Sequence, residues 1–442
     1  MDGFTPFFLG MRRFRGDFGP AIDAATPSLI GLPCLAPEAG DFRQQVAASI
    51  LLLERDCWVL LAVSEFGEPA HLPGWQDLPH GLVWRIPGTM RIRADRLVAR
   101  RCVAGPVEIP GNSSRSPRGF WSRPHLILLA DELPAPPGPG EDGAALLAEA
   151  TRVEAIELHA GDLHATVQIR PCLRLSAFRR DGMPSLIATG DRDPSGLRTW
   201  FMAPAQDDRS PLIGLRPARR VDGDAARCVV TTGREPICGL EVIWEVGLDA
   251  AGDRLRLRQG LRNHGTEPLR LACWSILVGA NPERMKALLL RGPDSTRPAL
   301  RLHAPDHELG TNFSLSPGPW PGSGVHDLPE GLAVDPPQPA ERSHIKVGLR
   351  SHEGLCALID GDTVLMSRVA AEEPGPYPEG DLNLTSYRSR DIIEVEHVGP
   401  LTLCGPGETL WLEQELRTTT IPGISGESAD RQAACLRAAW AG

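Results

Sequence analysis

Short β patterns separated by turns recur along most of this chain, and they constrain its fold more than any other feature. Runs such as "LEVIWEVGL" and "LRLRQGL" alternate apolar and polar residues, as half-buried strands do. Long helical patterns are nearly absent until "SADRQAACLRAAW", which predicts a tail helix capped at Ser428. Strands of this kind bury their apolar faces in sheets, so we predict a mainly β protein built on a large antiparallel sandwich. Turn-forming residues separate the runs, as at Asp181-Gly182, Ala251-Gly252-Asp253 and Asp360-Gly361-Asp362.

A stretch rich in proline and glycine divides the 442 residues. "LPAPPGPGEDG" contains an unbroken run of Pro and Gly from Pro136 to Gly140, which suits neither a helix interior nor a central strand. The module before it is mostly β in pattern and resembles no family that we recognise. We therefore predict an N-terminal mostly-β module at 1–135, a linker and short helix at 136–152, the sandwich at 153–418 and the tail helix at 419–442. Within the sandwich, residues 281–345 are rich in Pro and Gly, and we expect long loops over the sheet there.

Composition and charge narrow the classes of partner. Acidic residues outnumber basic ones, 56 to 46, and the net charge of −10 argues against a nucleic-acid partner. The ten cysteines are scattered without a CxxC pair, which indicates small buried side chains in a reducing compartment. The most apolar stretch is interrupted by Glu54, Arg55 and Asp56, so it predicts no membrane span. We expect a cytoplasmic protein without a membrane partner, and no pattern indicates its oligomeric state.

Nucleotide-binding and hydrolase signatures are missing from the sequence. It has no Gly-x-Gly-x-x-Gly after a strand, no P-loop and no Gly-x-Ser-x-Gly elbow. We therefore predict no cofactor.

The segment "DIIEVEHV" raises the question of function. Strand side chains alternate between faces, so Glu394 and Glu396 share one face, while Ile393, Val395 and His397 point to the other. Two adjacent carboxylates can act as a general base, hydrogen-bond sugar hydroxyls or bind a hard cation. They can equally belong to an ordinary solvated strand face.

Five segments within residues 153–418, about 60% of the chain, resemble the galactose-mutarotase-like supersandwich proteins and, within them, the bacterial DUF4380 family. The most specific is the last, which carries a Glu-x-Glu, a Gly-Pro and a Pro-Gly-Glu turn. The segments are "LHATVQIRPCLRLSAFRRDG", "LRTWFMAPAQDD", "LRLRQGLRNHGTEPLRLACWSILV", "HIKVGLRSHEGLCALI" and "YPEGDLNLTSYRSRDIIEVEHVGPLTLCGPGETLWLEQEL".

The resemblance implies an antiparallel sheet that cups a sugar, with a late-strand Glu as base at the anomeric hydroxyl. Glu394 and Glu396 occupy that late strand. The two histidine signatures of the mutarotases, Asn-His-x-Tyr-Phe and His-Pro-Tyr-Phe, are missing. The strand expected to carry the second histidine has Trp274, and "NHG" is predicted to be a turn, so His264 receives no catalytic role.

Six further residues are candidates for contacting the substrate. Arg198 and Trp200 share a face if "LRTWF" is extended, and the indoles of Trp200 and Trp274 can stack on a pyranose or simply fill the core. Lys346 can bind a sugar oxygen or lie at the sheet edge with its ammonium in solvent. Tyr377 and Asn383 flank the Glu strand, and Asn383 is also a common turn former.

Three histidines in the predicted loops, His303, His307 and His326, can supply an acid or a metal ligand, or can be solvated. Pro305 argues against a helix that would place His303 and His307 on one face. We predict no metal site from this spacing.

The sequence therefore predicts a carbohydrate-active protein that binds a sugar or sugar derivative on the concave face of the sandwich. It predicts either an aldose 1-epimerase-like isomerase or a related lyase or hydrolase, with Glu394 or Glu396 as base. The alternative is a non-catalytic carbohydrate-binding module, which would use the same face without turnover. A third possibility is that the N-terminal module forms the functional site.

Overall fold

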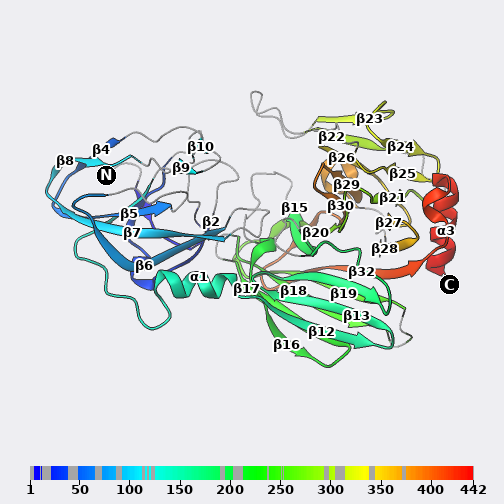
Figure 1. The fold of residues 1–442 in the computed structure, drawn as a ribbon, viewed down its shortest axis with the longest axis horizontal. Helices are drawn as coiled ribbons and strands as arrows, with labels where there is room; N and C mark the ends of the chain where they lie inside the picture. Colours follow the sequence, from blue (N-terminus) through cyan, green and yellow to red (C-terminus); the bar gives the residue numbers. More distant parts are fainter. Residues whose placement is uncertain are drawn as a thin grey trace. The chain divides into compact units, whose positions relative to one another are not determined.

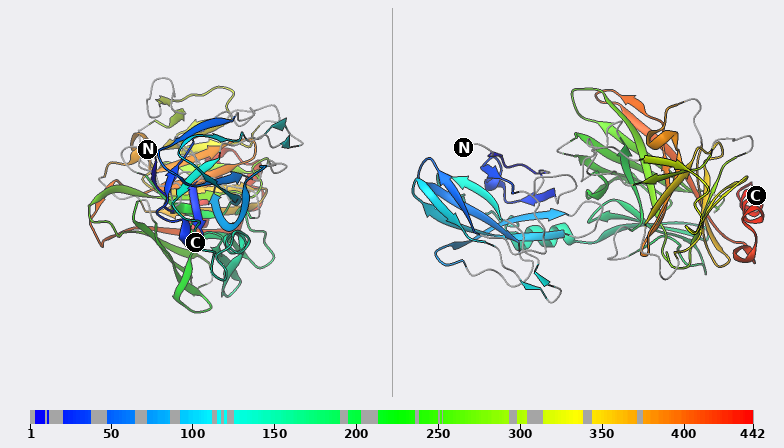
Figure 2. Two further views of the ribbon diagram at one scale, coloured as in Figure 1. Left: turned by 90° about the vertical axis from the view of Figure 1, so that its left-hand side faces the viewer. Right: turned by 90° about the horizontal axis from the view of Figure 1, so that it is seen from above.

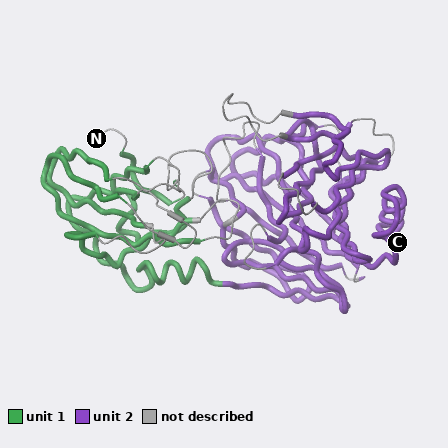
Figure 3. The backbone as a smooth tube through the Cα atoms, turned by 45° about the horizontal axis from the view of Figure 1, so that its top comes forward, with its two compact units in different colours: residues 1–152 green, residues 153–442 purple. Residues whose placement is uncertain are grey.

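The computed structural model divides the chain into two compact units, residues 1–152 and 153–442 (Figure 3). It describes residues 4–9, 11, 21–37, 48–64, 72–85, 92–111, 115–116, 119–120, 125–189, 195–202, 213–235, 238–249, 251, 253–292, 298–303, 314–337, 344–370 and 375–441.

The first unit is mostly β, as predicted. Its described strands form a seven-stranded antiparallel sheet in the order β1-β3-β11-β5-β7-β6-β2, with two short two-stranded sheets, β4-β8 and β9-β10 (Figure 1). The bounds are β1 Thr5–Pro6, β2 Ala21–Ala25, β3 Pro33–Leu35, β4 Ser49–Leu53, β5 Cys57–Ser64, β6 Gln76–Arg85, β7 Ile92–Cys102, β8 Gly105–Ile109, β9 Arg115–Ser116, β10 Gly119–Phe120 and β11 Leu126–Ala130.

Both faces of the seven-stranded sheet are buried. Leu60 and Ala62 of β5 belong to one apolar cluster, while Val59 and Leu61 belong to the other, as strand alternation requires. Helix α1, Gly143–Thr151, begins at Asp142, whose carboxylate accepts from Ala145 N at 2.8 Å. Its start approaches β6 so closely that a Cβ on Gly81 would lie 2.2 Å from Gly143 Cα, so only glycine fits there.

The second unit contains two large antiparallel sheets (Figures 1 and 2). Among the described residues, the first sheet has the order β12-β13-β14-β15-β20-β30-β29-β26-β22-β23, and β31 pairs with β20 beside β30. Its strands are β12 Glu154–Ala160, β13 Leu163–Arg170, β14 Arg174–Arg180, β15 Leu197–Met202, β20 Leu269–Val278, β22 Leu300–His303, β23 Ser314–Pro317, β26 Ile345–Leu349, β29 Leu384–Arg388, β30 Ile393–Val398 and β31 Thr402–Cys404.

The second sheet has the order β16-β17-β18-β19-β32-β28-β27-β21-β25-β24. Helix α3, Ala429–Ala441, packs its apolar side on the outer face of β21, β27 and β28, through Leu436 and Trp440. The strands are β16 Arg219–Gly223, β17 Arg227–Arg234, β18 Leu240–Leu248, β19 Leu255–Asn263, β21 Lys286–Leu290, β24 Val325–Leu328, β25 Gly331–Val334, β27 Leu355–Asp360, β28 Thr363–Val369 and β32 Thr409–Thr420.

The main core of this unit lies between the two sheets. Strand β18 shows the pattern most clearly, because Leu240, Val242, Trp244 and Val246 are buried while the residues between them are partly exposed. The predicted mainly β fold with a large antiparallel sandwich is therefore confirmed.

The expectation of long loops across residues 281–345 was wrong. Five strands lie in this region: β22 and β23 extend the first sheet, and β21, β24 and β25 extend the second. Each has only four or five residues, too few for alternation to be recognised among so many prolines and glycines.

All ten cysteines are free, and eight of them are buried. Within the described part of the chain, no helix combines enough length and apolar character to cross a membrane.

Candidate functional site

The register of five neighbouring strands gathers the predicted carboxylates and most of the other candidates on one face of the first sheet. Residues directly opposite each other in antiparallel strands share a face. Trp200 is opposite Trp274, Trp274 is opposite Val398, and Glu394 is opposite Tyr387, which is in turn opposite Lys346. We call this set the β30 face. Its polar and aromatic members are Arg198, Trp200, Trp274, Lys346, Thr385, Tyr387, Glu394 and Glu396.

Glu394 is a buried carboxyl beside a single arginine. Arg198 Nη2 donates to Glu394 Oε1 at 3.1 Å, and the two side chains are 8% and 9% exposed. Burial raises the pKa of Glu394 to about 7; the Arg198 guanidinium opposes this rise, while the Glu396 carboxylate adds to it. A carboxyl in this state exchanges a proton near neutral pH.

Glu396 lies in a different environment on the same strand. Its Oε2 accepts from Lys346 Nζ at 3.0 Å, Trp274 Nε1 at 3.0 Å and Thr385 Oγ1 at 2.9 Å. The Glu396 side chain is 2% exposed. Neither Glu394 nor Glu396 is therefore on a solvated strand face, which was the alternative interpretation of the sequence.

Lys346 connects Glu396 to a third carboxylate. Its Nζ lies 2.8 Å from Glu379 Oε2 and 4.8 Å from the centre of the Trp274 ring. Burial alone would lower the pKa of Lys346, but the carboxylates of Glu379 and Glu396 raise it above its ordinary value. Lys346 therefore stays an ammonium ion.

Glu379 reaches Lys346 from an unusual turn, labelled α2 (Pro378–Asp381). Glu379, Gly380 and Asp381 have φ values of 54°, 81° and 67°, so three successive residues adopt the left-handed conformation. For a residue with a side chain this conformation costs about 1–3 kcal/mol, and it persists only where the surroundings hold it. The ion pair with Lys346 is one such restraint.

Two buried donors on β15 have no acceptor among the described residues, namely Arg198 Nε and Trp200 Nε1. Buried donors are nearly always satisfied, so unpaired ones mark the place of a water or a ligand. Trp200 also packs in the core of the unit, where a Cβ on Gly214 would lie 2.6 Å from Trp200 Cε3. Trp200 therefore has the core role, one of the two that the sequence left open, and its contact with a ligand stays a prediction.

The structure places Tyr377 and Asn383 away from this arrangement. Asn383 Oδ1 accepts from Ser351 N at 2.7 Å and its Nδ2 donates to Ser351 O at 2.8 Å, which fixes a loop. The Arg350 guanidinium lies 3.8 Å from the centre of the Tyr377 ring. Both residues line a separate cavity at the end of β30.

Sequence reasoning missed three residues that contact or oppose the carboxylates. Thr385 and Tyr387 alternate along "LTSYR", and the hairpin between β29 and β30 places them opposite Glu396 and Glu394. Their alternation was the available signal. Glu379 is 33 residues from Lys346 in sequence, and no local pattern indicates that pair.

The loop histidines form no metal site in the described part of the chain. His326 Nε2 lies 2.7 Å from Asp335 Oδ2, and no group of three potential ligands occurs among the described residues. His307 and the side chain of His303 lie outside the described residues.

Behind the β30 face, a chain of buried polar side chains crosses the core between the sheets. Its members on the first sheet are Thr199, Ser275 and His397, each adjacent in sequence to a member of the β30 face: Arg198, Trp274 and Glu396. All three are at most 2% exposed.

Partners from the second sheet connect these three residues, and we call the whole set the core polar chain. Thr199 accepts from Trp244 Nε1 at 2.6 Å and donates to Gln259 Oε1 at 2.5 Å. Gln259 Nε2 and Ser275 Oγ both donate to Gln414 Oε1, at 2.7 and 2.8 Å. Gln414 Nε2 donates to Ser367 Oγ at 2.7 Å, and Ser367 Oγ lies 2.8 Å from His397 Nε2. The chain ties β15, β20 and β30 to the opposite sheet directly behind the site.

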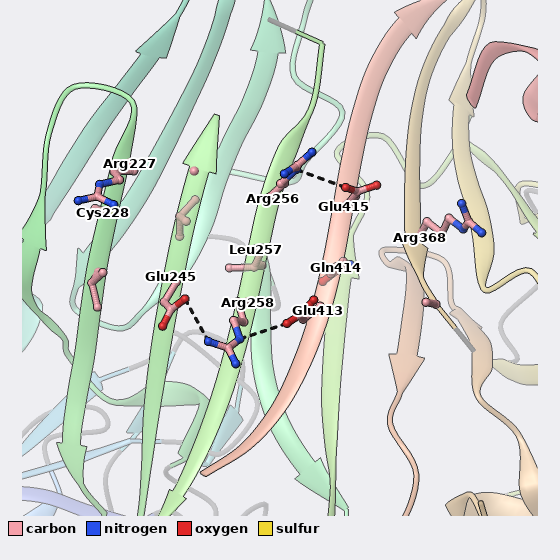
Figure 4. Close-up of a pocket in the computed structure, with 14 residues that line it drawn as sticks. Arg227, Cys228, Glu245, Arg256, Leu257, Arg258, Arg368, Glu413, Gln414 and Glu415 are labelled. Atoms are coloured by element: carbon pink, nitrogen blue, oxygen red, sulfur yellow. Dashed lines mark hydrogen bonds and ion pairs between the residues drawn. The ribbon is translucent and has the colours of Figure 1, made fainter. Parts of the chain in front are cut away.

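A broader hollow of about 710 Å³ lies on the outer face of β17, β18, β19 and β32 (Figure 4). Five of its charged residues pair with one another: Arg258 lies 3.5 Å from Glu245 and 3.2 Å from Glu413, and Arg256 lies 3.4 Å from Glu415. Exposed pairs of this kind are ordinary on a solvated sheet. We therefore place the candidate site on the β30 face.

Comparisons with known proteins show distant similarity in fold. No family model matches the chain, so the resemblance to the DUF4380 family stays a prediction, and no curated protein matches it in sequence. A galactose mutarotase-like protein from Lactobacillus casei is 12% identical and has a TM-score of 0.45, with 60% of this chain and 100% of that chain covered.

Two further solved structures are similar at the same level. A candidate aldose 1-epimerase from Escherichia coli K12 is 13% identical with a TM-score of 0.44, covering 61% of this chain and 100% of that one. A TPR-domain containing protein from Parabacteroides distasonis is 11% identical with a TM-score of 0.43, covering 86% of this chain and 56% of that one. Similarity this low carries no conclusion about activity.

Proposed function

We propose that residues 153–442 bind a carbohydrate on the β30 face and act at its anomeric centre with Glu394 as the acid–base group. The observation that carries this proposal is the contrast between two carboxyls on one strand. Glu394 has a pKa of about 7 and one arginine partner, whereas three donors hold Glu396 Oε2. Neighbouring carboxyls in environments this different are the usual arrangement for acid–base chemistry.

The unpaired donors fit a polyhydroxylated ligand. Arg198 Nε and Trp200 Nε1 lie on the same face as Glu394 and have no acceptor among the described residues. Sugar hydroxyl oxygens accept such hydrogen bonds, and the indole of Trp274 offers an aromatic surface beside them. The late-strand Glu-x-Glu and the Pro-Gly-Glu turn that follows it are the motifs by which this sequence resembles the mutarotase-like proteins.

The proposed step is ring opening and closure of an aldose. The Glu394 carboxylate accepts the proton of the anomeric hydroxyl as the bond from the anomeric carbon to the ring oxygen breaks. The ring oxygen takes a proton, and Tyr387 is placed to supply it, because it lies opposite Glu394. Burial, together with the Glu394 carboxylate, raises the pKa of Tyr387, so the phenol is protonated at neutral pH. Re-closure on the other face of the carbonyl gives the second anomer and returns both protons.

The test is saturation-transfer NMR of the full chain against neutral hexoses and disaccharides, with the anomeric protons followed in the same tubes. We expect binding and accelerated anomer exchange, with the rate rising through pH 7 as Glu394 becomes the carboxylate. Glu394→Gln should retain binding and lower the exchange rate about 10²–10⁴-fold. Glu413→Gln, on the outer face of the other sheet, is the matched control and should leave the rate unchanged.

A carbohydrate-binding module without turnover is the second candidate. It is favoured by the full engagement of Lys346, which contacts both Glu379 and Glu396 and so holds part of the face rigid. Saturable binding with no change in anomer exchange would support the module and contradict the isomerase. If no sugar binds, both candidates are contradicted.

A further inference from the structure

A separate cavity of about 210 Å³ lies at the end of β30. Its lining includes Ala370 after β28, Tyr377 before α2, His397 on β30 and Trp411 on β32. It shares the exposed residues Ala370 and Glu413 with the hollow of Figure 4, so the two adjoin at the surface.

His397 is the polar group on which the inference rests. The side chain is buried, with 1% of the residue exposed, and its Nε2 lies 2.8 Å from Ser367 Oγ. Ser367 Oγ accepts from Gln414 Nε2, and we assign its own hydrogen to the contact with His397 Nε2, which also lies 3.5 Å from Cys356 Sγ. We infer from this network that the ring carries its hydrogen on Nδ1. No acceptor for Nδ1 occurs among the described residues.

The charge of the cavity decides the class of ligand. Burial lowers the pKa of His397 to about 3, so the imidazole is neutral at any physiological pH and offers a hydrogen bond without a charge. Glu413 is the one charged side chain in the described lining, and it is already paired with Arg258 at 3.2 Å, so the lining offers no unpaired charge to an ion. Asn383 also lines the cavity, but its amide is occupied by the backbone of Ser351.

The volume of the cavity and its aromatic lining limit the size and kind of ligand. The volume is below the range of about 300–1,000 Å³ for pockets that hold drug-sized ligands, so a single small molecule fits. Guanidinium groups cover one face of each aromatic ring, Arg350 on Tyr377 at 3.8 Å and Arg258 on Trp411 at 4.0 Å. The remaining aromatic surface suits the C–H groups of a sugar ring or polyol.

We propose that this cavity is a second binding site, which takes one uncharged polyhydroxylated molecule, a free monosaccharide or a polyol, with a hydroxyl oxygen accepting from His397 Nδ1. None of the polar and aromatic members of the β30 face lines this cavity, and binding there does not depend on catalysis by Glu394.

The test is ¹⁵N NMR of the full chain labelled at histidine. The chain has 12 histidines, and the signal of His397 is assigned by its loss in His397→Gln. Glucose and galactose are titrated as monosaccharides, glycerol and myo-inositol as polyols, and glucuronate as the anionic counterpart. We expect a saturable shift of His397 Nδ1 with at least one neutral probe and none with glucuronate.

Ala370→Trp blocks the mouth of the cavity from an exposed position and should abolish the shift, whereas Ala251→Trp in an exposed turn should not. Glu394→Gln should leave the shift intact, which separates this site from the proposed function. The proposal is overturned if no neutral probe shifts His397, if Ala370→Trp leaves the shift unchanged, or if Glu394→Gln removes it.

Discussion

Replacing Lys346 with methionine is expected to lower the free energy of unfolding by about 4 kcal/mol. Methionine fills the space of the lysine stem but removes the ammonium that lies between Glu379 and Glu396. Those two side chains are 5% and 2% exposed, so each carboxylate loses its nearest cation inside the protein. Removing one partner of a buried ion pair typically costs about 3–5 kcal/mol. Denaturant unfolding of the full chain, followed by tryptophan fluorescence, measures the difference.

Two further variants test whether the stability lost in Lys346→Met is due to the buried charges. Lys286→Met removes an ammonium 3.4 Å from Asp335 at a more exposed position, and it should cost less than about 1 kcal/mol. Adding Glu379→Gln to Lys346→Met should recover part of the lost stability, since one of the two uncompensated charges is gone. A loss below about 1 kcal/mol for Lys346→Met would mean that water already screens the three charges.

Gln414→Leu is expected to lower the free energy of unfolding by about 4 kcal/mol, because it breaks hydrogen bonds of the core polar chain. Leucine leaves Gln259 Nε2 and the Ser275 hydroxyl without their acceptor, and Ser367 Oγ without its donor. Each buried polar group left unsatisfied costs about 1–3 kcal/mol, and small shifts of the neighbours relieve part of the sum.

Glu413→Leu is the matched control, because it places the same side chain one residue away on the outer face of β32. It loses only a surface ion pair with Arg258 and should change stability by less than about 1 kcal/mol. If the two variants lower the free energy of unfolding equally, the hydrogen bonds of the core polar chain do not stabilise the fold.

Local pattern was sufficient to predict the strand that carries the site. Alternation along "DIIEVEHV" places Glu394 and Glu396 on one face and His397 on the other, and both placements agree with the register of β30. The same rule predicted that Arg198 and Trp200 share one face of β15, which agrees with the register of that strand. These features follow from the two-residue period of a strand, which any stretch of five or six residues displays.

Contacts between distant segments had no such signal. Arg198 and Glu394 are 196 residues apart, and their ion pair exists only because β15 and β30 both flank β20. The sequence also grouped Tyr377 with the Glu strand, whereas Tyr377 lines the cavity at the end of β30 and Glu379, two residues later, contacts Lys346. Strand order determines such neighbours, and a single sequence does not reveal strand order.

Glu394 is proposed to exchange its proton near neutral pH, and a carboxyl NMR titration measures this exchange. Protein labelled with ¹³C at the glutamate side-chain carboxyl is titrated from pH 4 to 9, with the Glu394 signal assigned by its loss in Glu394→Gln. We expect a midpoint at about 7, since the effect of burial on the pKa of Glu394 outweighs that of the Arg198 guanidinium. A midpoint near the ordinary value of 4.5 would contradict it, because Glu394 would then be ionised throughout the physiological range and no longer poised for acid–base catalysis.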